Sequence, residues 1–268
     1  MDPAHREVVA ALDCGTNSTR LLITGSAGPE IRLMRITRLG QGVDATERLD
    51  PEAIARTLSV LGDFRGVMDL HKVTRARLVA TSAVRDALNR DEFLAAATNV
   101  VGVPAELLDG NAEGALAFAG ATASLDLPPA AVVVIDIGGG STEVVSGADG
   151  ISVISLDLGC VRLTERYLHH DPPNPDELDE VVGLIGSELE RAARALPHLA
   201  TPGLTLVGLA GTVSTLGALS QGLVDYDRDR IHHLILDATA VERWCDRLAT
   251  EPATERGRRP GMAPGRED

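Results

Sequence analysis

Two stretches of the chain share one pattern of apolar and polar positions. Residues 10–22 read AALDCGTNSTRLL, and residues 133–145 read VVIDIGGGSTEVV. Each stretch is an apolar run ending in an Asp, a turn of small residues and a second apolar run, which predicts a strand, a tight turn and a returning strand. When Asp13 is aligned with Asp136, a glycine and a Ser-Thr pair of the two turns also coincide. The chain therefore contains an internal repeat.

The segments after the two copies are predicted to follow a similar order. After the first copy, the pattern predicts strand, helix, strand, helix, strand and helix at 30–37, 51–71, 76–81, 90–100, 105–108 and 111–123. After the second copy, it predicts a strand at 151–156, helical segments at 160–168 and 175–195, a strand at 204–209 and a helix at 211–221. A duplicated α/β unit is expected, with a cleft between its copies.

The stretch DLPPA at 126–130 divides the predicted lobe I, residues 1–125, from the predicted lobe II, residues 126–268. By symmetry, a final strand and helix are expected in lobe II. The last residues instead read ATERGRRPGMAPGRED, which is polar and rich in Arg, Gly and Pro. Lobe II is therefore predicted to be incomplete at its C-terminus.

Composition excludes several classes of function. The formal net charge is -14 and aromatic residues make up 2%, which argues against general binding to nucleic acid or to an anionic membrane. Three widely spaced cysteines without a CxxC pair argue against a zinc site or a disulfide framework. No signal peptide or membrane-spanning run is found, so a cytoplasmic enzyme is expected.

Three glycine- and hydroxyl-rich segments are candidate phosphate sites. Glycines allow backbone N–H groups to approach an anion closely, and hydroxyls add further donors. The third segment opens a helix, a place that also favours anions. The alternative for the first two is a simple hairpin turn, but two matched copies and a third segment favour binding. The candidate residues are Gly15, Thr16, Asn17, Ser18, Thr19, Gly138, Gly139, Gly140, Ser141, Thr142, Gly211 and Thr212.

Carboxylates stand beside these segments. Asp13 and Asp136 end their strands and Glu143 follows the second turn, so all three are candidate ligands of Mg²⁺. For Asp13, capping of the turn is the competing role. Glu113 has small neighbours and room to reach a water molecule, although a Glu in the first turn of a helix is also ordinary.

Three arginines are candidates for local positive charge beside the carboxyl groups: Arg20, Arg85 and Arg162. The adjacent His232 and His233 are interpreted as packing or surface residues, because no third metal ligand has suitable spacing.

Taken together, several motifs resemble the exopolyphosphatase and guanosine-pentaphosphate phosphatase (Ppx/GppA) family, which belongs with actin, sugar kinases and heat-shock chaperones. They are DCGTNSTRLLI at 13–23, ATSAVRDALNRDEF at 80–93, GNAEGALAFAG at 110–120, DIGGGSTE at 136–143, LGCVRLTERYL at 158–168 and GLAGTVSTLGAL at 208–219. The resemblance implies two RNase H-like lobes of the actin-like ATPase type. It also implies removal of a terminal phosphate with the help of Mg²⁺ or Mn²⁺.

The resemblance implies roles for individual residues. Glu113 is expected to be the catalytic base, with Asp136 and Glu143 holding the metal. Phosphate contacts are expected from Asn17, Ser18, Arg85, Gly139, Ser141 and Thr212. Where the family has two acids and an Ala, this chain has Ala112-Glu113-Gly114. The segment Gly265-Arg266-Glu267-Asp268 resembles the start of the family's PGR-x-D motif.

Short inorganic polyphosphate is the expected substrate, because the chain lacks the extra C-terminal domain of longer family members. Guanosine pentaphosphate or a nucleoside triphosphate is the enzymatic alternative, and a non-catalytic phosphate or nucleotide sensor is the alternative from another class. A homodimer is kept open as the oligomeric state.

Overall fold

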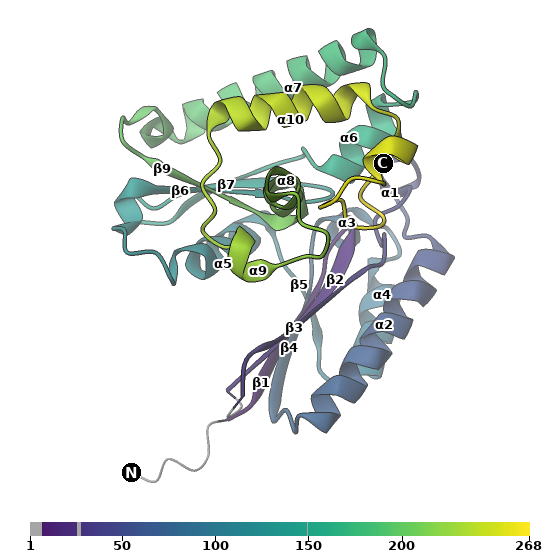
Figure 1. Cartoon of the computed structure of the whole chain (residues 1–268). Helices are drawn as coiled ribbons and strands as arrows, with labels where there is room; N and C mark the ends of the chain where they lie inside the picture. Colours follow the sequence, from purple (N-terminus) through teal and green to yellow (C-terminus); the bar gives the residue numbers. More distant parts are fainter. Residues whose placement is uncertain (1–6, 26–27, 149) are drawn as a thin grey trace. The chain divides into compact units, whose positions relative to one another are not determined.

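The computed structural model describes residues 7–25, 28–148 and 150–268, and these fall into two compact units (Figure 1). Unit 1 ends at Glu113 and unit 2 begins at Gly114. The sequence places the boundary at 125/126 instead. The difference arises because Phe118, in the second half of helix α5 (Gly110–Thr122), packs with Val132 and Val145 of unit 2.

Unit 1 is built on a five-stranded sheet with the order β3-β2-β1-β4-β5. Strand β2 pairs antiparallel with β1 and β3, whereas β1, β4 and β5 run parallel. The strands are β1 (Val9–Cys14), β2 (Ser18–Thr24), β3 (Ile31–Ile36), β4 (Arg75–Ala80) and β5 (Ala105–Leu107). The helices before α5 are α1 (Val43–Thr46), α2 (Pro51–Leu70), α3 (Ser82–Asp86) and α4 (Arg90–Val101).

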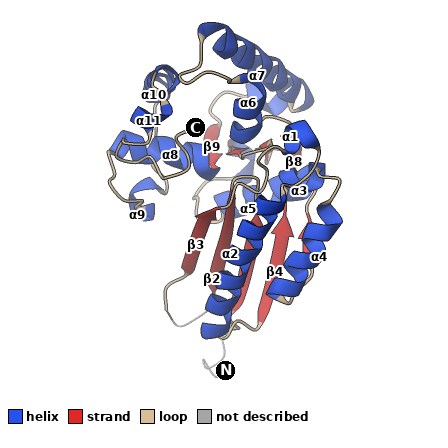
Figure 2. Ribbon diagram, turned by 90° about the vertical axis from the view of Figure 1, so that its right-hand side faces the viewer, coloured by secondary structure: helices blue, strands red, loops and turns tan. Residues whose placement is uncertain are grey.

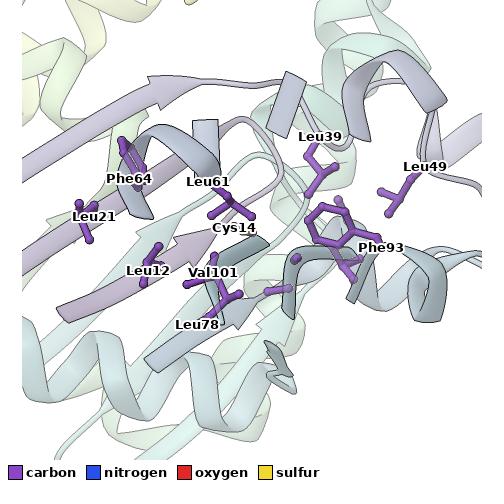
Figure 3. Packing of buried hydrophobic residues seen from close by; sticks show 14 of the residues in the cluster. Leu12, Cys14, Leu21, Leu39, Leu49, Leu61, Phe64, Leu78, Phe93 and Val101 are labelled. Carbon is purple, nitrogen blue, oxygen red and sulfur yellow. The ribbon is translucent and has the colours of Figure 1, made fainter. Parts of the chain in front are cut away.

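Helices α2 and α4 lie on one face of this sheet and bury the core of unit 1 (Figures 2 and 3). Helix α2 begins where the Asp50 side chain accepts hydrogen bonds from the first-turn amides and Pro51 fixes the first helical φ. Its buried positions recur every three or four residues, and Leu61 and Phe64 meet the strand residues Leu12 and Leu21.

Unit 2 repeats the arrangement with a four-stranded sheet of order β8-β7-β6-β9. Its strands are β6 (Val132–Ile137), β7 (Thr142–Ser146), β8 (Ser152–Leu156) and β9 (Thr205–Leu209). Its helices are α6 (Cys160–Tyr167), α7 (Pro175–Ala195), α8 (Ala210–Gln221), α9 (Arg228–Ile231), α10 (Ala238–Thr250) and α11 (Ala253–Arg256), with 3-10 turns η1 (Pro129–Ala131) and η2 (Pro197–Ala200).

Both faces of the unit 2 sheet are covered. On one face, Val133 and Val144 pack with Ala192 of α7, while on the other face Val132 and Val145 pack with Phe118. This explains why strand β6 is apolar at consecutive positions instead of alternating.

The two sheets share the order of their first four strands, which confirms the predicted duplication into two RNase H-like α/β lobes. Strand β4 of unit 1 pairs with β5 on its outer side, but no described strand pairs with β9 there. No helix in the described ranges is long and apolar enough to cross a membrane.

Turn 1, the segment between β1 and β2, is held by the loop that follows β3. The amides of Thr37 and Arg38 both donate to the carbonyl oxygen of Asn17, at 3.0 Å each, and the amide of Gly40 donates to that of Thr16 at 2.8 Å. A side chain at position 40 would collide with the Thr16 methyl group. Glycine is therefore required where this loop approaches turn 1.

Turn 2, the segment between β6 and β7, is held in the same way by the start of α6. The amide of Cys160 donates to the carbonyl oxygen of Gly138 at 3.0 Å, and the amide of Arg162 donates to that of Gly139 at 3.1 Å. The guanidinium of Arg162 also donates, through Nε, to the carbonyl oxygen of Gly140 at 2.7 Å. Three successive carbonyl groups of turn 2 thus point toward α6.

The close approach of α6 to turn 2 predicts the effect of one substitution. A Cβ at Gly159 would collide with the backbone of Gly139 and Gly140, which cannot move aside as a flexible side chain can. We expect Gly159→Ala to lower the free energy of unfolding by about 1–3 kcal/mol, the usual cost of overpacking. Urea denaturation followed by circular dichroism measures this change.

The control is Gly186→Ala in α7, where an added Cβ meets no atom within 4 Å. This change is expected to leave stability unchanged or raise it by up to about 1 kcal/mol, because alanine favours a helix over glycine. Equal stability of the two variants would show that turn 2 adapts to the added methyl group.

Candidate active site

The predicted site residues of unit 1 gather at one edge of its sheet. Strands β1, β4 and β5 are parallel, and the register places Cys14 beside Ala80 and Ala80 beside Leu107, so their carboxyl ends coincide. Turn 1, helix α3 and the start of α5 follow these three ends. Ligands of open α/β sheets bind at such an edge.

Arg85 and Glu113 form an ion pair at this edge. Nη1 of Arg85 lies 3.3 Å from Oε2 of Glu113 and donates to the carbonyl oxygen of Leu108 at 2.9 Å. Their side chains are 25% and 20% exposed, so the pair is largely shielded from water. Asp109 accepts a hydrogen bond from the amide of Ala112 and caps α5, which places Glu113 in its first turn.

The covered carbonyls of turn 1 fix the direction of its amides. In a planar trans peptide, the C=O and the following N–H point in opposite directions. Because the carbonyls of Thr16 and Asn17 face the loop after β3, the amides of Asn17 and Ser18 point away from that loop. The hairpin is closed by the Gly15 amide, which donates to the carbonyl oxygen of Ser18 at 3.0 Å.

In turn 2, the same argument fixes the direction of three amides, one more than in turn 1. Its carbonyls at 138–140 accept from α6, so the amides of Gly139, Gly140 and Ser141 point away from α6. Successive backbone amides directed to one side form an anion-binding concavity. The geometry of both turns is therefore suited to phosphate oxygens.

The third candidate segment lies at the carboxyl edge of the unit 2 sheet. Strands β6 and β9 are parallel, with Asp136 beside Leu209, and Gly211 and Thr212 lie in the first turn of α8. The guanidinium of Arg266 packs against Gly211, in the space that a Cβ at position 211 would take. Arg266 thus brings a positive charge to this segment, a role that the sequence analysis did not assign.

Two predicted phosphate ligands are engaged within the protein. The hydroxyl of Thr19 lies 2.9 Å from that of Thr37, and the hydroxyl of Thr142 donates to the carbonyl oxygen of Leu158 at 2.6 Å. Both threonines are buried. Their side chains fasten the turns to the neighbouring loops, whereas the serines before them, Ser18 and Ser141, stay predicted phosphate ligands.

Two predicted metal ligands lie side by side in unit 2. The register of the antiparallel strands β6 and β7 pairs Asp136 directly with Glu143, so both side chains lie on the same face of the sheet. Glu143 is only 1% exposed. Two adjacent carboxylates, one of them buried, repel each other unless a cation or a proton compensates.

The matching place in unit 1 has the opposite charge balance. There, the register pairs Asp13 with Arg20, so an acid faces a base. In the described parts of the chain, no group of three or more His, Cys, Asp or Glu side chains could by itself enclose a metal ion. The pairing of Asp136 with Glu143 therefore fits a cation, and Asp13 stays a predicted metal ligand.

Cys14 and the two adjacent histidines lie in ordinary environments. Cys14 is buried, and its burial together with the neighbouring Asp13 raises the pKa of its thiol. His232 and His233 stack with their ring centroids 3.9 Å apart, and Nε2 of His233 lies 3.1 Å from the Ser124 hydroxyl.

The residues that hold the turns were outside the sequence prediction, apart from Arg162, which was predicted only as a positive charge. Gly40 and Gly159 are ordinary loop glycines in the sequence, and their distance from the turns hides their role. Arg266 was recognised only as part of a motif. In each case the contact joins residues far apart in the chain, and no local pattern signals it.

The model of the Ppx/GppA phosphatase family matches residues 29–268. Exopolyphosphatase 2 of Mycobacterium tuberculosis is 46% identical over 275 residues, which cover 97% of this chain and 85% of that protein. A bifunctional 3-dehydroquinate synthase/phosphatase of Fusobacterium nucleatum is 31% identical over 238 residues, 83% of this chain and 36% of that protein.

Solved structures agree with this result. The crystal structure of an exopolyphosphatase-like protein has a TM-score of 0.90 at 37% identity, covering 97% of this chain and 84% of that one. The Ppx/GppA family member of Aquifex aeolicus has a TM-score of 0.77 at 35% identity, covering 97% and 85%. The chain therefore belongs to the Ppx/GppA phosphatase family and is a phosphoanhydride hydrolase.

Proposed function

We propose that this protein removes the terminal phosphate from inorganic polyphosphate, with short chains as its preferred substrate. The observation that carries the proposal is the cross-strand pair of carboxylates, Asp136 and Glu143, beside turn 2. The amides of this turn point away from α6, which holds the turn in place. The choice of polyphosphate is supported by the 46% identity to a protein named exopolyphosphatase 2.

A divalent metal ion, Mg²⁺ or Mn²⁺, fits Asp136 and Glu143. Such ions are commonly held by one or two carboxylates together with substrate phosphates, without a cage made only of protein ligands. When bound, the metal would neutralise phosphate oxygens and polarise the bond that breaks. The two carboxylates would in turn lose the repulsion that their pairing creates.

The phosphate groups are held by backbone amides and side chains. In unit 1 the amides of Asn17 and Ser18 are the proposed phosphate donors, and in unit 2 those of residues 139–141 are. The hydroxyls of Ser18 and Ser141 add donors, and Thr212 contributes at the start of α8 together with the charge of Arg266. Because these donors are fixed before the substrate arrives, little reorganisation is needed in the transition state.

Glu113 acts as the general base. Its carboxylate accepts a proton from a water molecule while the water oxygen attacks the terminal phosphorus. The bond from phosphorus to the bridging oxygen breaks, and the products are orthophosphate and a polyphosphate shorter by one unit. Arg85 orients Glu113 through the ion pair and adds positive charge for the phosphoryl group.

The preference for short chains follows from charge. The formal net charge of -14 repels a polyanion, and the positive charge available at the ligand edges comes from a few arginines: Arg20, Arg85, Arg162 and Arg266. Such a small basic surface can compensate a few phosphate groups but not a long polymer.

Substrate choice is tested by measuring phosphate release in parallel. We expect kcat/KM to be highest for short polyphosphate, lower for long polyphosphate, and lowest for guanosine pentaphosphate and ATP. A preference for either nucleotide would replace the proposed substrate. Binding of phosphate compounds without release of phosphate would identify a sensor.

Glu113→Gln tests the general base. The amide keeps the shape of the side chain but accepts no proton, so phosphate release is expected to fall by about 10²–10⁴-fold while substrate binding persists. The matched control is Glu106→Gln, since Glu106 also pairs with an arginine of unit 1, Arg77, at 2.8 Å. Wild-type turnover in Glu113→Gln would remove the base from the mechanism.

Arg85→Ala tests the second half of the ion pair. Loss of charged hydrogen bonds is expected to reduce kcat/KM by about 10–100-fold, since such bonds contribute about 1.5–3 kcal/mol. Arg77→Ala is the matched control, because it removes the exposed ion pair with Glu106. Equal effects of Arg85→Ala and Arg77→Ala would contradict a role for Arg85.

A further inference from the structure

Glu143 is an ionisable side chain in an almost fully buried position of β7. A buried carboxylate is costly unless hydrogen bonds or a cation compensate its charge. Its neighbour across β6 is Asp136, which adds repulsion instead of compensation. On its other side, Glu143 has a neighbour that can donate a hydrogen bond to its carboxylate.

That other neighbour is Ser155 in β8. The register of β7 and β8 pairs Glu143 directly with Ser155, and the Ser155 hydroxyl donates to Oε1 of Glu143 at 2.7 Å. An ionised carboxylate only accepts hydrogen bonds, so the hydroxyl must be the donor. A short hydrogen bond to a charged acceptor is about twice as strong as a neutral one and fixes the orientation of the carboxylate.

The matching cross-strand positions of unit 1 provide a comparison. There, the residues on successive strands are Asp13, Arg20 and Met34, whereas unit 2 has Asp136, Glu143 and Ser155. A hydroxyl occupies the third place only in the unit whose second place is a carboxylate. In unit 1 the second place is an arginine and the third is the apolar Met34.

We propose that Ser155 is a positioning residue that holds the Glu143 carboxylate in the orientation needed to bind the divalent metal. This inference rests on the proposed metal site of Asp136 and Glu143. Ser155 itself touches neither the substrate nor the metal and acts only through its hydrogen bond to Glu143. Partners of this kind typically change metal affinity or activity by about 10–100-fold when removed.

The test is the affinity of the whole protein for Mn²⁺, measured by calorimetric titration without substrate. Ser155→Ala is expected to raise the Kd for Mn²⁺ by about 10–100-fold. Ser155→Thr keeps the hydroxyl and is expected to have a Kd close to that of the wild type. In assays with polyphosphate, the Mn²⁺ concentration for half-maximal activity should rise in Ser155→Ala, while kcat at saturating Mn²⁺ stays near the wild-type value.

Two variants control the experiment. Ser152→Ala removes a hydroxyl from the same strand at an exposed position opposite Ser146, and it should leave the Kd unchanged. Asp136→Asn removes a proposed ligand, and it should raise the Kd. The melting temperature of Ser155→Ala without metal is expected to fall by no more than a few degrees, about what the loss of one hydrogen bond to a buried carboxylate costs.

The outcomes separate this inference from the proposed function. If Asp136→Asn weakens Mn²⁺ binding but Ser155→Ala does not, the metal site stands and the role of Ser155 is overturned. If Mn²⁺ binding is as weak in Ser155→Thr as in Ser155→Ala, the inference is also overturned, because the hydroxyl is then not what holds Glu143. Absence of Mn²⁺ binding by the wild type overturns both the metal site and the inference.

Discussion

The candidate site depends on hydrogen bonds behind the two turns, more than on the residues of the turns themselves. A glycine-rich turn has many accessible conformations, and its amides bind an anion only when they point in one direction. Here the carbonyls of Asn17 and Gly139 each accept two backbone amides, and the guanidinium of Arg162 covers Gly140. Because the peptide is planar, holding the carbonyls fixes the amides without using any donor that a phosphate needs.

Duplication explains how one fold supplies two kinds of chemistry. The same register in the two sheets pairs Asp13 with Arg20 and Asp136 with Glu143. The first pair places an acid opposite a base, whereas the second places two acids opposite each other. A single exchange of arginine for glutamate at matched positions thus distinguishes the two units, and the proposed metal site lies in the unit that carries the glutamate.

The sequence predicted most elements because their signals are local. The repeat gave the strand order, and caps such as Asp50-Pro51 gave the start of α2. The sequence analysis does not predict helix α10, although Val241, Trp244 and Leu248 recur at helical spacing after the cap Asp237. This helix could therefore have been predicted from the sequence. The contact of Gly159 with turn 2 could not be predicted, because residues that are close in space but far apart in the chain leave no periodic pattern in the sequence.

The charge of -14 remains compatible with a polyanionic substrate because electrostatic attraction acts locally. Exposed charges more than about 10 Å apart are largely screened at physiological salt. The partly buried pair of Arg85 and Glu113 is screened less, and Arg266 lies against the backbone at Gly211. A few well-placed arginines and oriented amides can therefore attract a phosphate group, while the acidic remainder of the surface discourages the nonspecific binding of long polyanions such as nucleic acid.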